Sequence, residues 1–166
     1  LDRCEMEGRV LVAEHNGAYV LKLVGDVRLT LSSSIDQFVE RMFSCVSCQS
    51  VIVDLTETEG LDSTTLGMLA KMALFVRKQL HVRPMAVSDN DGILRLLNSM
   101  GFEQIFDIQR TSEVCATADC GELQATTLDE KEAKAKVLQA HQVLMTLNQK
   151  NRETFKELVD SLCKAS

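Results

Sequence analysis

The sequence contains no tryptophan, one proline and eight glycines in 166 residues. So few turn-forming residues argue against a β-sandwich, whose many short strands need frequent tight turns. Basic charge is also scarce, because 18 lysines and arginines face 24 aspartates and glutamates and the net charge is −6. An acidic chain without a basic stripe is not expected to bind nucleic acid directly. No apolar run approaches the roughly 18 residues of a membrane span, so we expect a soluble, cytosolic protein without membrane contact.

Motifs of common enzyme classes are missing as well. A serine hydrolase needs its serine in a GxSxG elbow, but Leu61 and Thr65 stand at the two glycine positions around Ser63. A nucleotide-binding loop needs GxxxxGK[ST], but Gly60 and Gly67 are seven positions apart and no lysine follows Gly67. We therefore expect a protein that is not an enzyme and that binds no cofactor.

The six cysteines allow a zinc site to be considered. Cys45 and Cys48 form a CxxC pair, and Cys115 and Cys120 form a second, wider pair. The spacing of the second pair is unusual for a zinc site, and two cysteines are left over. We favour reduced thiols that act as small apolar side chains over zinc or a disulfide framework, so no metal site is expected.

The residues that are present suit an α/β fold, with 45% hydrophobic and 25% charged side chains. Asn16-Gly17 predicts a hairpin between two strands within 8–28. A helix with a possible cap at Ser32 to Ser34 follows, then a nearly all-apolar strand over 51–55. The later predictions are a helix over 63–80, a strand over 83–88, a helix over 89–102 and a strand over 103–108. This order predicts an α/β sandwich or an open mixed sheet.

The C-terminal part has a different composition. Residues 110–127 show no clear period, whereas 128–164 lack proline and glycine and are rich in helix-forming residues. Steps of four and three connect Val137, His141, Leu144, Asn148, Asn151, Phe155, Leu158 and Leu162 in a heptad seam. One continuous rod would be roughly 55 Å long, so the helix either projects or breaks near Asn148 and Asn151 and folds back. We predict a domain over 1–109, a linker over 110–127 and a helical extension over 128–166, which packs on its own chain or forms a homodimer.

The junction of residues 51–69, VIVDLTETEGLDSTTLGML, carries the clearest functional signal. An apolar strand is followed by a loop with Asp62, Ser63, Thr64 and Thr65, and then by an amphipathic helix. Asp62 or Ser63 at the N-cap would satisfy free N–H groups of that helix. Capping accounts for one of these four residues and leaves the other three unexplained.

This junction resembles the signature of STAS domains of the anti-sigma factor antagonist type, in which Asp-Ser-Ser-Gly-Leu-Gly opens a helix after a strand that ends in Asp. Asp62, Ser63, Leu66 and Gly67 match the signature, Thr64 replaces a serine and Thr65 replaces a glycine. The resemblance covers about residues 8–109. With its tail, the chain looks closest to HsbA-like antagonists.

The resemblance implies a bacterial regulator of transcription that works by partner switching. Such proteins bind an anti-sigma factor, often one with kinase activity, and phosphorylation of the serine after the Asp switches binding off until a phosphatase restores it. Ser63 matches this phosphoacceptor. A phosphate at a helix N-terminus meets the favourable end of the helix dipole and adds about −1.5 to −2 charges near Glu57, Glu59 and Asp62. The expected partner-binding residues are Asp62, Thr64, Thr65, Glu57, Glu59, Met68, Met72 and Phe75.

Two questions remain open at the level of the sequence. Met68, Met72 and Phe75 lie nearly opposite the core face of the helix over 63–80, so this stripe is either covered by the tail or a neighbouring helix, or exposed to the partner. The alternative functions are a receiver-like domain with Asp54 as phosphoacceptor, which lacks the second acid of a magnesium site, and a STAS module for ligand sensing or complex assembly.

Overall fold

The computed structural model describes residues 7–44, 48–111 and 121–164. Seven strands form one mixed sheet in the order β6-β5-β3-β2-β1-β7, and β4 pairs with β2 off this path. The strands are β1 (Arg9–His15), β2 (Ala18–Val27), β3 (Ser50–Asp54), β4 (Thr58–Leu61), β5 (Met85–Ser88), β6 (Asp107–Arg110) and β7 (Gly121–Leu123). The helices are α1 (Leu29–Ser44), α2 (Ser63–Leu80), α3 (Asp91–Ser99), α4 (Glu130–Met145) and α5 (Gln149–Lys164), with a 3₁₀ turn η1 (Phe102–Gln104). The predicted mixed α/β fold with a C-terminal helical extension is confirmed.

The hairpin of β1 and β2 forms where the sequence predicts it. Asn16 and Gly17 both have positive φ, of 51° and 86°, as a type I′ turn requires. The strands pair antiparallel from Arg9 opposite Val24 to His15 opposite Ala18. Parallel pairing then joins β2 to β3, β3 to β5 and β5 to β6.

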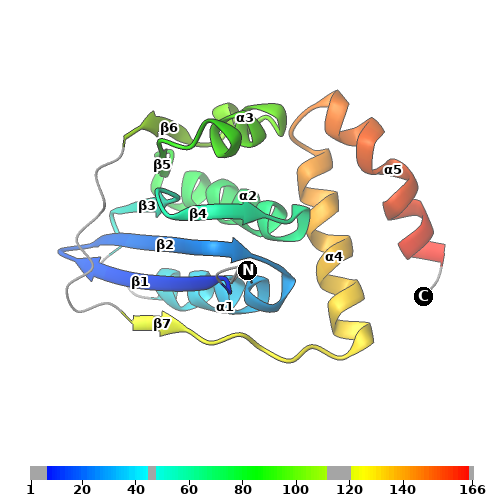
Figure 1. Cartoon of the computed structure of the whole chain (residues 1–166), viewed down its shortest axis with the longest axis horizontal. Helices are drawn as coiled ribbons and strands as arrows, with labels where there is room; N and C mark the ends of the chain where they lie inside the picture. The colour runs from blue at the N-terminus through cyan, green and yellow to red at the C-terminus, as the bar shows by residue number, and fades with distance from the viewer. Residues whose placement is uncertain (1–6, 45–47, 112–120, 165–166) are drawn as a thin grey trace, which may run out of the picture.

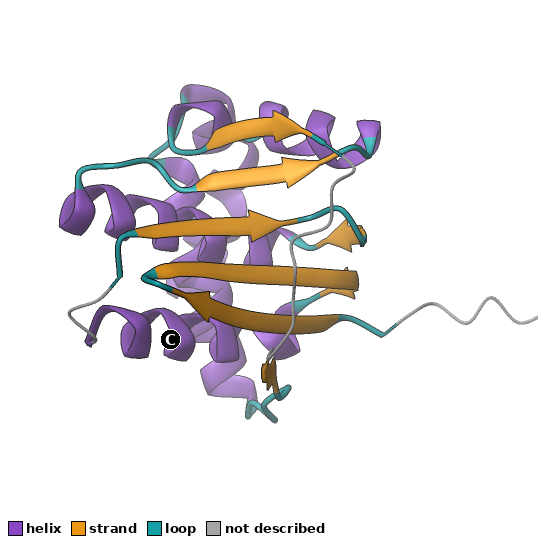
Figure 2. Ribbon diagram, turned by 90° about the vertical axis from the view of Figure 1, so that its left-hand side faces the viewer, coloured by secondary structure: helices purple, strands orange, loops and turns teal. Residues whose placement is uncertain are grey.

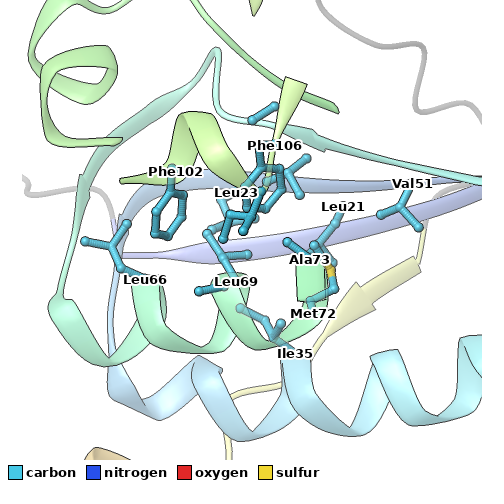
Figure 3. Close-up of a cluster of buried hydrophobic side chains, with 14 of the residues drawn as sticks. Leu21, Leu23, Ile35, Val51, Leu66, Leu69, Met72, Ala73, Phe102 and Phe106 are labelled. Atoms are coloured by element: carbon cyan, nitrogen blue, oxygen red, sulfur yellow. The ribbon is translucent and has the colours of Figure 1, made fainter. Parts of the chain in front are cut away.

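The hydrophobic core lies between the sheet and the helices that cover it. Figure 2 shows the strands as one layer with helices behind them. In Figure 3, Leu66, Leu69, Met72 and Ala73 of α2 face Leu21 and Leu23 of β2, Val51 of β3, Ile35 of α1 and the rings of Phe102 and Phe106. All of these side chains are buried. Because α2 presents one whole face to this core, the direction of its N-terminus is fixed by packing.

Several local predictions need correction. Helix α1 begins at Leu29, so Ser32, Ser33 and Ser34 lie inside the helix and are buried instead of capping it. The Ser32 hydroxyl donates to the carbonyl of Leu29 at 2.7 Å, a bond back to the preceding turn. Part of the predicted strand over 103–108 is the 3₁₀ turn η1, and β6 begins only at Asp107. The short strand β4 was not predicted.

The predicted linker also contains ordered structure. Strand β7 pairs antiparallel with β1, with Val10 opposite Leu123, and so covers the edge of the sheet. The following residues are attached to α1, because the Ser34 hydroxyl donates to the carbonyl of Gln124 and the Thr126 N–H donates to the carbonyl of Thr30. The chain therefore reaches α4 along a defined path beside α1.

The C-terminal helix breaks and folds back, as one of the two alternatives predicts. Helix α4 ends at Met145 and α5 begins at Gln149, and the two helices pack against each other. The side chain of Asn148 accepts from the Asn151 N–H at 2.7 Å, which caps α5. Asn151 is 2% exposed, and its Nδ2 donates to the carbonyls of Met100 and Leu144 at 2.8 and 2.9 Å. The amides of the seam thus join the α4–α5 hairpin to the end of α3. Figure 1 shows α4 across the end of the molecule where β2 and β4 finish, with α5 beyond it.

Candidate functional site at the N-terminus of α2

Asp62 holds the N-termini of two helices together. It is the N-cap of α2, with extended φ and ψ of −78° and 165°. Its Oδ1 accepts from the Thr65 N–H at 2.7 Å, and its Oδ2 accepts from the N–H of Leu29, the first residue of α1, at 2.8 Å. A carboxylate between two helix N-termini satisfies free donors and meets the positive ends of both helix dipoles. Of the two possible caps that the sequence offers, Asp62 is the one used, and Ser63 is left for another role.

Ser63 is the first residue of α2 and is half-buried. Its Oγ lies 2.7 Å from Nε2 of His141 in α4. Nδ1 of His141 lies 2.6 Å from the carbonyl oxygen of Val137, which can only accept, so Nδ1 carries a hydrogen. In the neutral ring Nε2 is then an acceptor, and the Ser63 hydroxyl donates to it. The candidate phosphoacceptor is therefore bonded to the helical extension.

His141 is held on several sides. It is 2% exposed, and its ring packs edge-to-face on Phe155 of α5 with ring centroids 4.9 Å apart. Nothing in the sequence pairs it with Ser63, because 78 positions separate the two residues. The available signal is the place of His141 in the heptad seam, where a polar residue among apolar ones indicates a buried hydrogen bond.

The neighbouring hydroxyls and methionines of α2 are not on the surface. Thr64, Thr65, Met68 and Met72 are 5%, 0%, 2% and 2% exposed. Of the two open alternatives for the stripe, the covered one is correct for Met68 and Met72, which face α1 across a pocket of about 110 Å³ between the two helices. The prediction that Met72 lies opposite the core face is wrong, because Met72 belongs to the core. Phe75 is 40% exposed and packs edge-to-face on Phe43 of α1. A partner cannot reach the methionines or threonines while this packing is in place.

The three acids expected at this corner have different environments. Glu57 and Glu59 are exposed, and Asp62 is half-buried. Glu57 forms an ion pair with Lys22, which lies midway along β2 and is 5% exposed. Of the expected partner-binding residues, Asp62, Glu57, Glu59 and Phe75 are thus the ones that solvent reaches.

An ion-pair cluster that the sequence analysis missed joins α1, α2 and α4. Asp36 accepts from Lys71 of α2 at 2.8 Å and from Lys136 of α4 at 2.9 Å. Burial raises the pKa of Asp36, but the hydrogen bonds and charges of the two lysines outweigh it and hold the pKa below its usual value. The helical spacing of residues could not predict this cluster, because Asp36 and Lys136 are 100 positions apart in the sequence.

Asp54 is not placed to act as a phosphoacceptor. It is 0% exposed at the end of β3, and its Oδ1 accepts from the N–H of Thr56 at 2.9 Å and from the Thr56 hydroxyl at 2.6 Å. A buried carboxylate with these bonds organises the turn between β3 and β4. The receiver-like alternative therefore finds no support in the geometry.

The cysteines give no sign of a site in the part of the chain that the structure describes. Cys48 is buried, which raises the pKa of its thiol, and Cys163 is exposed. Cys48 is a free thiol. The remaining cysteines, Cys4, Cys45, Cys115 and Cys120, lie outside the described residues. The two cysteine pairs considered for zinc are therefore not tested by the structure. Among residues 7–44, 48–111 and 121–164, no group of three or more His, Cys, Asp or Glu side chains is arranged to hold a metal ion.

One hollow in the described part of the chain is not lined by Ser63. It has a volume of about 780 Å³ and is lined by Ser33 and Gln37 of α1, by residues 126–128 and by the side of α4 that includes Gln139. No helix within the described ranges is long and apolar enough to cross a membrane.

Comparison with known proteins identifies the family. The STAS domain profile matches residues 9–115, which includes β1 to β6 and α1 to α3 and ends before β7. No curated protein sequence matches the chain. A similar solved structure is the crystal structure of an anti-sigma factor antagonist from Mycobacterium paratuberculosis, with 20% sequence identity and a TM-score of 0.53. The match covers 67% of this chain and 92% of the mycobacterial one, and it shows a shared fold. The chain belongs to the STAS domain family, with a helical hairpin that follows the region matched by the family.

Proposed function

We propose that this chain is an anti-sigma factor antagonist, which binds an anti-sigma factor and is switched off when a kinase phosphorylates Ser63. The family and the fold shared with an antagonist support the general role. The observation that carries the switch is the position of Ser63, the first residue of α2, directly after an Asp62 that already caps the helix. Its hydroxyl is therefore not needed as a cap, and its hydrogen bond to His141 is the contact that modification would break.

The physical basis of the switch is local. A phosphate on Ser63 adds about −1.5 to −2 charges next to the Asp62 carboxylate and the exposed side chain of Glu59. The helix N-terminus tolerates this charge within the folded chain. A partner packed on the same corner would have to desolvate the phosphate beside carboxylates, and each 1.4 kcal/mol lost weakens binding about tenfold. Binding is thus abolished without refolding of the domain.

The partners implied are the anti-sigma factor, a serine kinase, which is the anti-sigma factor itself or a separate enzyme, and a phosphatase. From the resemblance of the sequence with its tail, we also propose a relationship to the HsbA-like group of antagonists. A homodimer through the helical extension remains a prediction, as does the division of the chain at residues 109 and 127.

A titration tests the proposal. The Ser63→Ala chain serves as bait to recover the anti-sigma factor, and the purified pair is then titrated by calorimetry. We expect Ser63→Ala to bind at least as tightly as the unmodified chain and Ser63→Glu to bind at least about tenfold more weakly. Ser99→Glu is the matched control, because Ser99 is exposed at the end of α3 and gains the same charge. Equal affinities for all variants would refute the switch.

The site of modification is tested separately by mass spectrometry of the chain purified from its own cells. Acid-stable phosphate on Ser63 supports the proposal. Acid-labile acyl phosphate on Asp54 would instead support the receiver-like function.

A further inference from the structure

Helix α4 crosses α2 in close contact, at a position where neither helix carries a large side chain. A Cβ added to Gly67 would lie 2.4 Å from the carbonyl oxygen of Ala140 and 2.5 Å from its Cβ. Gly67 and Ala140 therefore have no room between them, and any side chain at position 67 would push α4 away. Gly67 belongs to the family signature, whereas α4 lies outside the region that the STAS profile matches.

Next to this crossing, α4 covers the Ser63 hydroxyl. His141, the neighbour of Ala140, receives the hydroxyl's hydrogen bond at 2.7 Å. On the same helix, Lys136 reaches Asp36 of α1. Three of the contacts that hold α4 on the corner are thus a close helix crossing, one hydrogen bond and one ion pair. Leu144 of the same helix is also buried in the core.

A phosphate on Ser63 is incompatible with the hydrogen bond that the hydroxyl donates to a neutral His141. The phosphorylated oxygen has no hydrogen to donate, so Nε2 of the buried His141 loses its donor. If the phosphate turns towards the ring, its oxygens meet the acceptor nitrogen of the neutral ring. If it turns away, the buried nitrogen stays unpaired. Ala140 already touches Gly67, so α4 cannot shift towards α2 to relieve either problem.

We propose that α4 is an intramolecular cover for the Ser63 corner, and that a docked α4 and a phosphate on Ser63 exclude each other. The inference rests on the proposed function in taking Ser63 as the modified hydroxyl. It adds that the kinase and the anti-sigma factor reach this corner only when α4 has moved away. Unmodified, closed chains are then a resting state, distinct from the open form that binds and the phosphorylated form that does not.

The test measures the docking of α4 in the full chain, without any partner. The chain carries phosphoserine at position 63, introduced during translation, and hydrogen–deuterium exchange is followed in the amides of residues 130–145. We expect exchange in α4 to become at least about tenfold faster than in the unmodified chain, the change that 1.4 kcal/mol produces in an equilibrium constant. Phosphoserine at position 99 is the matched control and should leave α4 unchanged. Unchanged protection of α4 in the chain phosphorylated at Ser63 would overturn the proposal, as would slower exchange, which would indicate a phosphate bound to protonated His141.

A second variant reaches the same open state without altering Ser63. Gly67→Ala places a methyl group against Ala140, although alanine itself favours a helix interior. We expect faster exchange in α4 with unchanged exchange in α3; if this variant does not fold, His141→Ala takes its place. Release of α4 without any effect of Ser63 on anti-sigma factor binding would refute the proposed function and leave the cover standing. An effect of Ser63 on anti-sigma factor binding without release of α4 would refute the cover alone.

Discussion

The Asp62 side chain offers the sharpest test of how the site is built. Replacing it by alanine removes two acceptors at once, one for the Thr65 N–H and one for the Leu29 N–H. Loss of an N-cap costs about 1 kcal/mol, and a hydrogen bond to a charged group contributes about 1.5 kcal/mol or more. We therefore expect Asp62→Ala to lower the free energy of unfolding by about 2–3 kcal/mol. For a chain of this size the melting temperature should fall by about 5–10 °C.

Two further substitutions make this prediction quantitative. Asp62→Asn keeps one carbonyl oxygen but loses the charge and the second acceptor, so about half of the loss is expected. Asn90→Ala is the matched control, because Asn90 caps α3 through a single oxygen, which accepts from Gly92 and Ile93. Its cost should be that of one cap, about 1 kcal/mol. The assay is urea unfolding followed by circular dichroism. If Asp62→Ala costs no more than Asn90→Ala, the carboxylate does not join two helices and this reading of the site is wrong.

Other contacts lead to further predictions. Asp36→Asn should destabilise the protein at pH 7. Because the ion pairs lower the pKa of Asp36 in the folded state, the difference in unfolding free energy between the variant and the unmodified chain should shrink as pH falls below about 4. Urea titrations at pH 7 and pH 3 measure this difference, and a constant value would contradict the role of the ion pairs. Asn151→Ala removes two buried bonds and should cost about 2 kcal/mol in the same assay. Gly101→Ala should cost at least about 1–2 kcal/mol, since φ is +80° there and a Cβ would lie 2.7 Å from Nδ2 of Asn148. Gly92→Ala within α3 has ordinary φ and should cost less, although its Cβ would lie 3.2 Å from Oδ1 of Asn90; equal costs for the two variants would contradict this prediction.

The sequence predicts those parts of the fold that depend on local patterns. The Asn16-Gly17 turn allows few alternatives, and the 63–80 helix is bounded by Asp62 and has a regular apolar stripe. Strand β4 escaped prediction because four residues with two polar side chains and a glycine give no alternation to recognise. The three serines of α1 were misplaced because serine favours caps, while burial against the rest of the chain decides their position here.

The candidate site likewise contains residues that a local motif predicts and contacts that it does not. Ser63 and Asp62 are recognisable because they lie within one short motif. The bonds from Ser63 to His141 and from Asp36 to Lys136 are not recognisable in this way. They join residues that are 78 and 100 positions apart, with no local pattern between them. The covered state of the methionines likewise depends on the packing of α1 beside α2, which periodicity within α2 alone leaves open.

The short path from β7 to α4 has a consequence for competition. Only residues 124–129 separate the end of β7 from the start of α4, and part of this segment is bonded to α1. A tether this short keeps a detached α4 near its seat at an effective concentration on the order of millimolar. Any partner protein that binds where α4 packs must compete with the tethered α4. The measured affinity of the partner is therefore lower than its affinity for a chain from which α4 is absent. Lengthening the tether by a flexible insert would dilute the internal competitor and raise the apparent affinity without altering a single contact.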